Sequence, residues 1–145
     1  MTTNYLDMNF QSISRNTSFV RATIGAFLSS LDLNMEELYD IKMAVSEAVT
    51  NAILHGYKND PHQLVQLTCS YQESQTHFDI TITVTDTGAG ITNIDQARQA
   101  MFTTSEDAER AGLGFTVMET IMDAVEISSK VDVGTTVTLH MTVQK

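Results

Sequence analysis

The sequence predicts an α+β fold, in which helices cover one face of a mostly antiparallel sheet in a two-layer sandwich. Apolar residues recur at helical spacing between residues 16 and 56, and five other segments alternate between apolar and polar residues. No linker or repeat divides the chain, and 145 residues fit one domain, since domains commonly hold roughly 100–150. We therefore expect a single domain over residues 1–145.

A strand and two helices are predicted in the N-terminal part. Residues 5–10 alternate and form a strand with one buried face. Residues 20–31 place apolar side chains at i, i+4, i+7, i+8 and i+11, which is typical of an amphipathic helix. Asn34, with Glu37 three residues later, resembles a helix-capping pair and predicts a second helix that ends near Gly56.

The C-terminal part is predicted to be mainly strand. The predicted strands are 65–71, 78–86, 125–129 and 135–143, and the predicted helices are 94–101 and 115–122. A turn containing Gly134 separates the last two strands.

Composition excludes several classes of protein. The chain carries 18 acidic and 8 basic residues, a net charge of −10, which disfavours direct binding to nucleic acid. A single cysteine excludes an internal disulfide framework or a multi-cysteine metal site. No apolar run reaches the roughly 20 residues of a membrane span, and no signal segment is visible, so a cytoplasmic protein is expected. A phosphate-bearing ligand would have to be held by backbone amides or a metal ion.

Asp86 is the first candidate site residue. It continues the inward phase of the strand 78–86, and a carboxylate is costly to bury without partners. The segment Thr87-Gly88-Ala89-Gly90 follows, where glycines permit close approach of the backbone to a ligand. The alternative is a strand that simply ends in a glycine-rich turn.

Glu47 and Asn51 are the second candidates. They stand at i and i+4 on one helix face, flanking the apolar stripe, as polar groups at the rim of a pocket would. A carboxylate there could act as general base, and an amide oxygen could bind magnesium. The alternative is a solvated helix face, and His55 is interpreted as a helix-end residue.

Gly112-Leu113-Gly114 is the third candidate, predicted to open the helix that starts at Phe115. Glycines at a helix N-terminus favour phosphate binding. No Gly-Lys-Ser/Thr occurs, and Val117 breaks the G-x-G-x-x-G pattern, so two other phosphate loops are excluded. The preceding segment 102–110 is predicted to be a mobile polar lid. Its Arg110 could reach a phosphate or pair with Glu106.

The order of these segments resembles the Bergerat (GHKL) ATP-binding fold over about residues 35–143. Along the chain come a helix with Glu47 and Asn51, a strand that ends in D-x-G-x-G and a lid. The glycine segment 112–114 and a final strand that contains Thr135 follow. Segment 46–57 resembles the corresponding helix of bacterial anti-sigma-factor serine kinases. Segments 97–99, 102–104 and 109–119 are most similar to the sporulation type of that family, and this similarity covers nearly the whole chain.

The resemblance implies a role for each site residue. Glu47 would be the catalytic base, Asn51 would hold Mg²⁺ between the phosphates, and Asp86 would accept the adenine amino group. The further nucleotide-binding residues that it implies are Gly88, Gly90, Thr103, Thr104, Arg110, Gly112, Gly114 and Thr135. Arg21 matches a family position that contacts partner proteins.

The implied function is an ATP-dependent protein-serine kinase that binds and inhibits an RNA polymerase sigma factor. Its substrate would be an anti-anti-sigma protein, phosphorylated on serine, and its cofactors would be ATP or ADP and Mg²⁺. The resemblance also implies a homodimer. One alternative is an ATP-binding anti-sigma module without kinase turnover. The other is a retroviral-type aspartic protease, suggested by Asp86-Thr87-Gly88, although such proteases are nearly all β.

Overall fold

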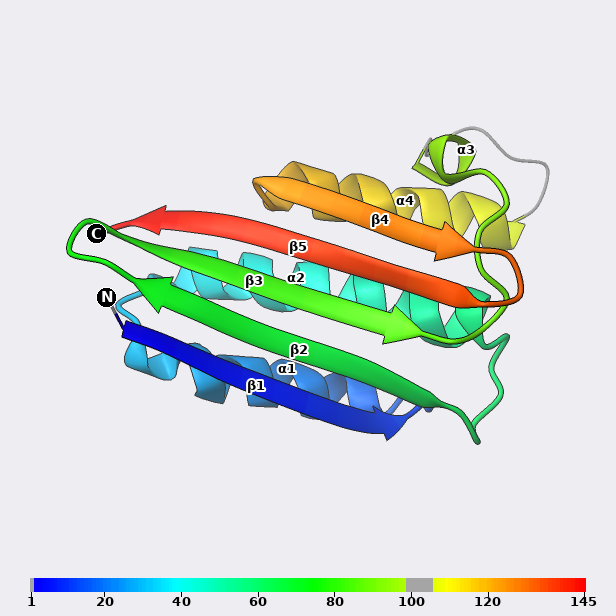
Figure 1. Cartoon of the computed structure of the whole chain (residues 1–145), viewed down its shortest axis with the longest axis horizontal. Helices are drawn as coiled ribbons and strands as arrows, with labels where there is room; N and C mark the ends of the chain where they lie inside the picture. The colour runs from blue at the N-terminus through cyan, green and yellow to red at the C-terminus, as the bar shows by residue number, and fades with distance from the viewer. Residues whose placement is uncertain (1, 99–105) are drawn as a thin grey trace.

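One five-stranded antiparallel sheet forms one layer of the molecule, with the strands in the order β1-β2-β3-β5-β4 (Figure 1). The structure is a computed structural model that describes residues 2–98 and 106–145, without the side chains of 106–112. The strands are β1 Thr2–Gln11, β2 Leu64–Glu73, β3 His77–Asp86, β4 Ala124–Lys130 and β5 Gly134–Gln144.

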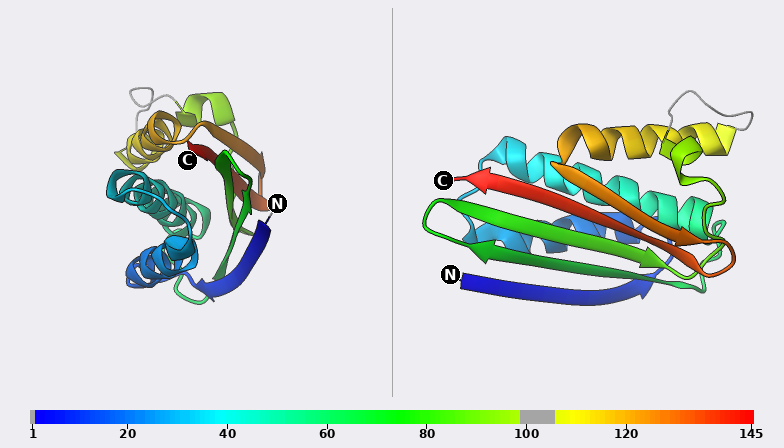
Figure 2. Two further views of the ribbon diagram at one scale, coloured as in Figure 1. Left: turned by 90° about the vertical axis from the view of Figure 1, so that its left-hand side faces the viewer. Right: turned by 45° about the horizontal axis from the view of Figure 1, so that its top comes forward.

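The helices that the structure describes lie on one face of this sheet, which confirms the predicted two-layer sandwich (Figure 2). They are α1 Asn16–Phe27, α2 Met35–Asn51, α3 Ile94–Arg98 and α4 Glu106–Ile121. A 3₁₀ turn, Leu28–Ser30, follows α1, and a π-helical turn, η2 Ala52–Gly56, continues α2. Among the described residues, no helix is both long and apolar enough to cross a membrane.

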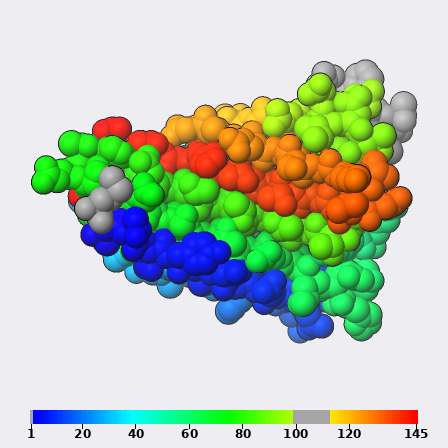
Figure 3. Space-filling view, in the orientation of Figure 1, coloured from blue at the N-terminus to red at the C-terminus, as the bar shows by residue number. Residues whose placement is uncertain are grey.

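The core lies between the two layers, because the central strands β2, β3 and β5 alternate between buried and more exposed side chains. In β3 the buried side chains are Phe78, Ile80, Ile82 and Val84, and the same phase ends on Asp86. Among the described residues no helix covers the opposite face of the sheet (Figure 2), and side chains of the five strands fill most of that face in Figure 3. Polar side chains on this face include the paired Thr85 and Thr136, whose hydroxyls are 3.1 Å apart.

The start of α2 confirms the predicted capping pair. The Asn34 side chain accepts a hydrogen bond from the Glu37 amide at 2.7 Å, and the Glu37 carboxylate accepts one from the Asn34 amide at 2.8 Å. Two of the amides that lack helical partners are thereby satisfied.

The start of α4 differs from the prediction. The helix begins at Glu106, so Gly112-Leu113-Gly114 lies inside it and does not open it. The segment 106–111 is Glu-Asp-Ala-Glu-Arg-Ala, mostly strong helix formers with acidic residues at the N-terminal end. The helix that these residues start continues through both glycines, although each interior glycine costs roughly 1 kcal/mol relative to alanine. The predicted polar lid is therefore helical over 106–110.

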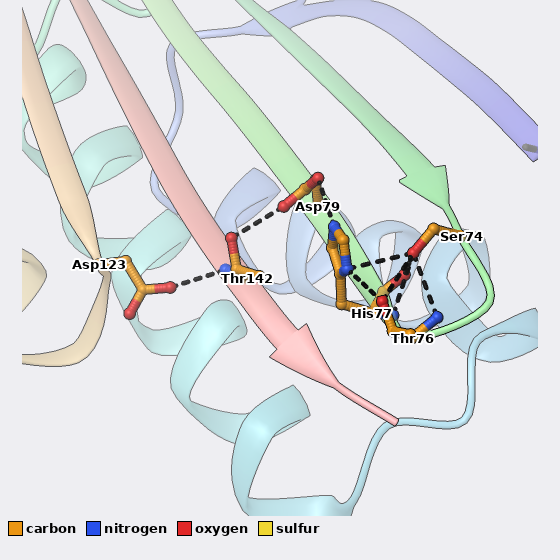
Figure 4. A network of polar contacts seen from close by, with 6 residues as sticks. All are labelled: Ser74, Thr76, His77, Asp79, Asp123 and Thr142. Carbon is orange, nitrogen blue, oxygen red and sulfur yellow. Dashed lines mark hydrogen bonds and ion pairs between the residues drawn. The ribbon is translucent and has the colours of Figure 1, made fainter.

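A polar network joins β3 and β5 to the β2–β3 turn and to the residue before β4, at the end of the sheet remote from Asp86 (Figure 4). The Thr142 hydroxyl donates to Asp79 at 2.8 Å, and the Thr142 amide donates to Asp123 at 2.6 Å. His77 lies 3.2 Å from Asp79 and also contacts the hydroxyl of Ser74 in the β2–β3 turn. These contacts tie the strand ends to the neighbouring turn and to the residue before β4.

Candidate functional site

A pocket of about 480 Å³, including its open mouth, lies between α2 and the adjoining ends of β3 and β5. Its walls are largely apolar, and four polar side chains converge on it, as is typical of a small-molecule site. The polar residues are Asn51, His55, Asp86 and Thr135, and the apolar ones include Ala48, Ala52, Val84, Ile91, Ala97, Phe115 and Val137. The sequence-predicted residues Asn51, Asp86, Gly90 and Thr135 are thus brought together.

Asp86 is the buried carboxylate of this pocket, with 6% of its surface exposed. The Gly88 amide donates to Asp86 Oδ1 at 3.0 Å. Burial raises the pKa of Asp86, and hydrogen bonds from the Gly88 and Thr135 amides oppose that rise. Asp86 therefore offers a carboxylate in a poorly hydrated site, where a hydrogen-bond donor on a ligand would be bound strongly.

Close contact between η2 and the turn after β3 places Asp86. A Cβ on Gly56 would lie 2.6 Å from the Asp86 carboxylate, and one on Gly88 would overlap the Gly56 carbonyl. That carbonyl accepts a hydrogen bond from the Ala89 amide at 2.9 Å. Gly88 is thus explained by packing against Gly56 and is not among the pocket-lining residues, whereas Gly90, at φ +75°, does line the pocket.

Glu47, Asn51 and Gly114 form a second group beside the pocket. A Cβ on Gly114 would lie 3.1 Å from Glu47 Oε2 and 3.2 Å from Asn51 Nδ2, so α4 passes directly over both side chains. Asn51 Nδ2 is buried and has no hydrogen-bond partner among the described residues. A buried polar group without a partner is costly, and a ligand could satisfy it.

The group fits a magnesium–nucleotide complex better than a metal held by protein alone. No cluster of three or more His, Cys, Asp or Glu among the described residues could hold a metal ion. Mg²⁺ commonly takes one or two protein oxygens and completes its shell with water and phosphate. Asn51 could supply such an oxygen.

The remaining predicted residues are placed less fully. Thr103 and Thr104 lie outside the described residues. Arg110 and Gly112 lie in the first turns of α4, and the Arg110 side chain is outside the description. Arg21 is half-buried on α1, and it does not line the pocket.

Sequence reasoning missed three contributors to the site. His55 lines the pocket, although it was expected to be only a helix-end residue. Ser129 on β4 accepts a hydrogen bond from the Ile91 amide at 2.7 Å and shares one with Thr135 Oγ1 at 2.8 Å. Tyr57 contacts the turn after Asp86. Only its place directly after Gly56 could have drawn attention to Tyr57.

Comparison with known proteins now identifies the family. The profile described as "Histidine kinase-like ATPase domain" matches residues 10–141. The chain is 46% identical over 142 residues to a protein of Geobacillus sp. (strain WCH70) named anti-sigma F factor, covering 98% of this chain and 94% of that one. A protein of the same name from Anoxybacillus flavithermus is 47% identical over 144 residues, covering 98% and 96%. The chain belongs to the anti-sigma F factor family.

Solved structures agree with this fold. The structure of the RsbU and RsbW domains of a Mycobacterium tuberculosis protein matches with a TM-score of 0.69 at 20% identity, covering 98% of this chain and 33% of that one. The histidine kinase domain of a blue-light-activated kinase from Erythrobacter litoralis matches with a TM-score of 0.56 at 18% identity, covering 91% and 61%. Membership of the anti-sigma F factor family, with its ATPase-type α+β fold, rules out the nearly all-β aspartic protease.

Proposed function

We propose that this chain is an ATP-dependent protein-serine kinase that binds and inhibits a sporulation sigma factor, sigma F. Its substrate is an anti-anti-sigma protein, which it phosphorylates on serine. The observation that carries the proposal is the meeting of Glu47 and Asn51 under Gly114, beside a pocket that contains the buried Asp86.

The pocket binds the adenine of ATP or ADP. Asp86 accepts a hydrogen bond from the exocyclic amino group, with Thr135 beside it on β5. Apolar side chains such as Ile91 and Val137 cover the faces of the flat base. A guanine presents a carbonyl oxygen where adenine has its amino group, and an ionised Asp86 would repel it.

The phosphates lie toward α4. Arg110 approaches the terminal phosphate, and the amides of Gly112 and Gly114 point to the phosphate chain. Amides inside a helix are already bonded to carbonyls four residues earlier. The first turns of α4, residues 106–112, therefore leave the helix when nucleotide binds, which Gly112 makes less costly.

Glu47 acts as the general base. It takes the proton from the substrate serine as the serine oxygen bonds to the γ-phosphorus and the bond from that phosphorus to the bridging oxygen breaks, releasing ADP. Asn51 would hold Mg²⁺, which neutralises charge on the phosphates when bound. Positioning and charge stabilisation dominate such transfers, so few side chains are needed.

The partners follow from the family. Relatives are named anti-sigma F factors, which supports a sigma factor as the bound protein. Arg21, on the outer helical layer, contacts the partner proteins.

A homodimer forms through the exposed edge of β1, because an edge strand offers unpaired backbone groups. The protein acts in the cytoplasm and does not contact DNA.

The test is to replace Glu47 by Gln and to measure ATP binding and transfer to a purified anti-anti-sigma protein separately. We expect phosphotransfer to fall by about 10²–10⁴-fold with ATP affinity nearly unchanged, since only proton transfer is removed. Glu36→Gln, at the exposed start of the same helix, is the control and should retain full turnover.

Two results would contradict the proposal. Equal losses of ATP affinity and turnover in Glu47→Gln would remove the base assignment. Wild-type protein that binds ATP and a sigma factor but transfers no phosphate would favour the alternative, an anti-sigma module without kinase turnover.

A further inference from the structure

We propose that Tyr57 is a positioning residue that sets adenine affinity and selectivity by holding the turn after Asp86. The inference rests on the proposed function, since it assumes that Asp86 accepts a hydrogen bond from the amino group of adenine. It adds a residue that touches neither the base nor the phosphates.

The hydroxyl of the buried Tyr57 side chain connects three segments of the chain by hydrogen bonds. The side chain is 7% exposed. Its oxygen accepts a hydrogen bond from the Thr87 amide at 2.8 Å and donates one to the Leu64 carbonyl at 2.6 Å. It also lies 3.3 Å from Thr87 Oγ1. This one oxygen atom thereby joins the residue after η2 to the start of β2 and to the residue after β3.

A second bond from the neighbouring residue secures the same turn. The Gly56 carbonyl accepts from the Ala89 amide at 2.9 Å, so residues 56 and 57 hold the turn at two points, Thr87 and Ala89. Between these points lies Gly88, whose amide donates to Asp86 Oδ1 at 3.0 Å. The direction of the Asp86 carboxylate therefore depends on where Tyr57 and Gly56 place this turn.

Loss of the hydroxyl should act on Asp86 and not on the fold as a whole. Tyr57→Phe keeps the ring in the core but leaves the Thr87 amide and the Leu64 carbonyl without that partner. The Thr87 amide must then either move to another acceptor or remain without a hydrogen bond, which costs the full free energy of its desolvation. Either outcome disturbs the acceptor that distinguishes adenine from guanine.

The experiment compares the affinities of magnesium ADP and magnesium GDP by calorimetric titration of the full chain. We expect Tyr57→Phe to raise the Kd for ADP by about tenfold, the size of one hydrogen bond of typical net strength. The Kd for GDP should change much less, so the ratio of the GDP Kd to the ADP Kd, which measures selectivity for ADP, should fall. With saturating ATP, turnover should stay near the wild-type rate, because Glu47 and Asn51 lie earlier on α2, and the KM for ATP should rise.

Two control variants separate positioning from general destabilisation. Tyr71→Phe removes another buried tyrosine hydroxyl, which contacts Asn4 at 3.2 Å and Ser30 at 3.3 Å but lies outside the pocket. It should leave both Kd values within about twofold of wild type. Thr87→Val removes the hydroxyl partner of Tyr57 but keeps the amide, and should also preserve the ADP affinity.

The inference is overturned if Tyr57→Phe binds ADP as wild type does, or if Tyr71→Phe weakens ADP as strongly. It is also overturned if Tyr57→Phe lowers ADP and GDP affinity by the same factor. Failure of the proposed function would look different, since wild-type protein itself would then show no preference for ADP over GDP.

Discussion

Asp86 illustrates a conflict between stability and binding in a single residue. Its burial disfavours the charged form, so the pKa of the carboxyl is raised from its ordinary value of 3.8. The protonated carboxyl contributes fully to the free energy of unfolding at pH values below 3.8, and this contribution is lost as the pH rises through the raised pKa. At neutral pH the protein therefore keeps a destabilising charge, which the proposed adenine contact uses.

Asp86→Asn should reverse this balance. We expect the variant to unfold at an equal or higher urea concentration than wild type at pH 7, with its advantage growing as the pH rises from about 3.8 through the raised pKa. Binding of ADP should weaken by at least about tenfold, since an ionised acceptor is lost. Urea denaturation between pH 3 and 8 and ADP titration measure the two effects, and a pH-independent stability difference would contradict the first.

The individual residues of the site were predictable to different degrees. Asp86 could be predicted, because the period-two pattern of β3 makes it the one charged residue on a buried phase. Ser129 and Tyr57 could not, because their importance comes from hydrogen bonds to Ile91 and Thr87, which are distant in the sequence. A single sequence carries periodicity but not these tertiary pairings.

The elements α2 and α4 show which local patterns sufficed at the level of secondary structure. The capping residues Asn34 and Glu37 predicted the start of α2 correctly. The π-helical turn η2 was not predicted, since its residues continue a pattern that suits an ordinary helix. The start of α4 was predicted wrongly, because two glycines were given more weight than the helix formers before them.

Gly114→Ala tests the role of α4. Alanine is favoured over glycine in a helix by up to about 1 kcal/mol, so we expect unfolding free energy to stay level or rise. The added Cβ would lie 3.1 Å from Glu47 and 3.2 Å from Asn51, and should lower phosphotransfer by roughly 10- to 100-fold by displacing them. A stable variant with wild-type turnover would contradict this placement.

A matched control for that variant lies on α1. Gly25→Ala also adds a Cβ inside a helix, but there it would meet only the flexible end of Lys42, at 2.7 Å. Because this contact is not part of the pocket, ADP affinity should remain at the wild-type value. Urea denaturation and ADP titration of the two variants separate helix stabilisation from disturbance of the site.

The charge of the whole molecule bears on its proposed partners. A net charge of −10 is compatible with a nucleotide site, because the proposed phosphate contacts are backbone amides, one arginine and Mg²⁺. The same charge would attract a basic surface on a sigma factor.

Salt should therefore weaken the sigma complex. We expect the association rate constant to fall by about tenfold or more between 50 and 500 mM salt, because long-range attraction is screened beyond a few ångströms at high ionic strength. The dissociation rate should change less. Stopped-flow association at several salt concentrations measures this, and a rate independent of salt would remove the electrostatic contribution.

The pairing of β1 has a consequence for synthesis on the ribosome. β1 ends at Gln11 and hydrogen-bonds to β2, which spans Leu64–Glu73. At about 5–20 residues per second, roughly 3 to 10 s separate the synthesis of Gln11 from that of Leu64. During that interval β1 has alternating apolar side chains and open backbone groups but no neighbouring strand, so we expect nascent β1 to be open to pairing with other chains until β2 has been made.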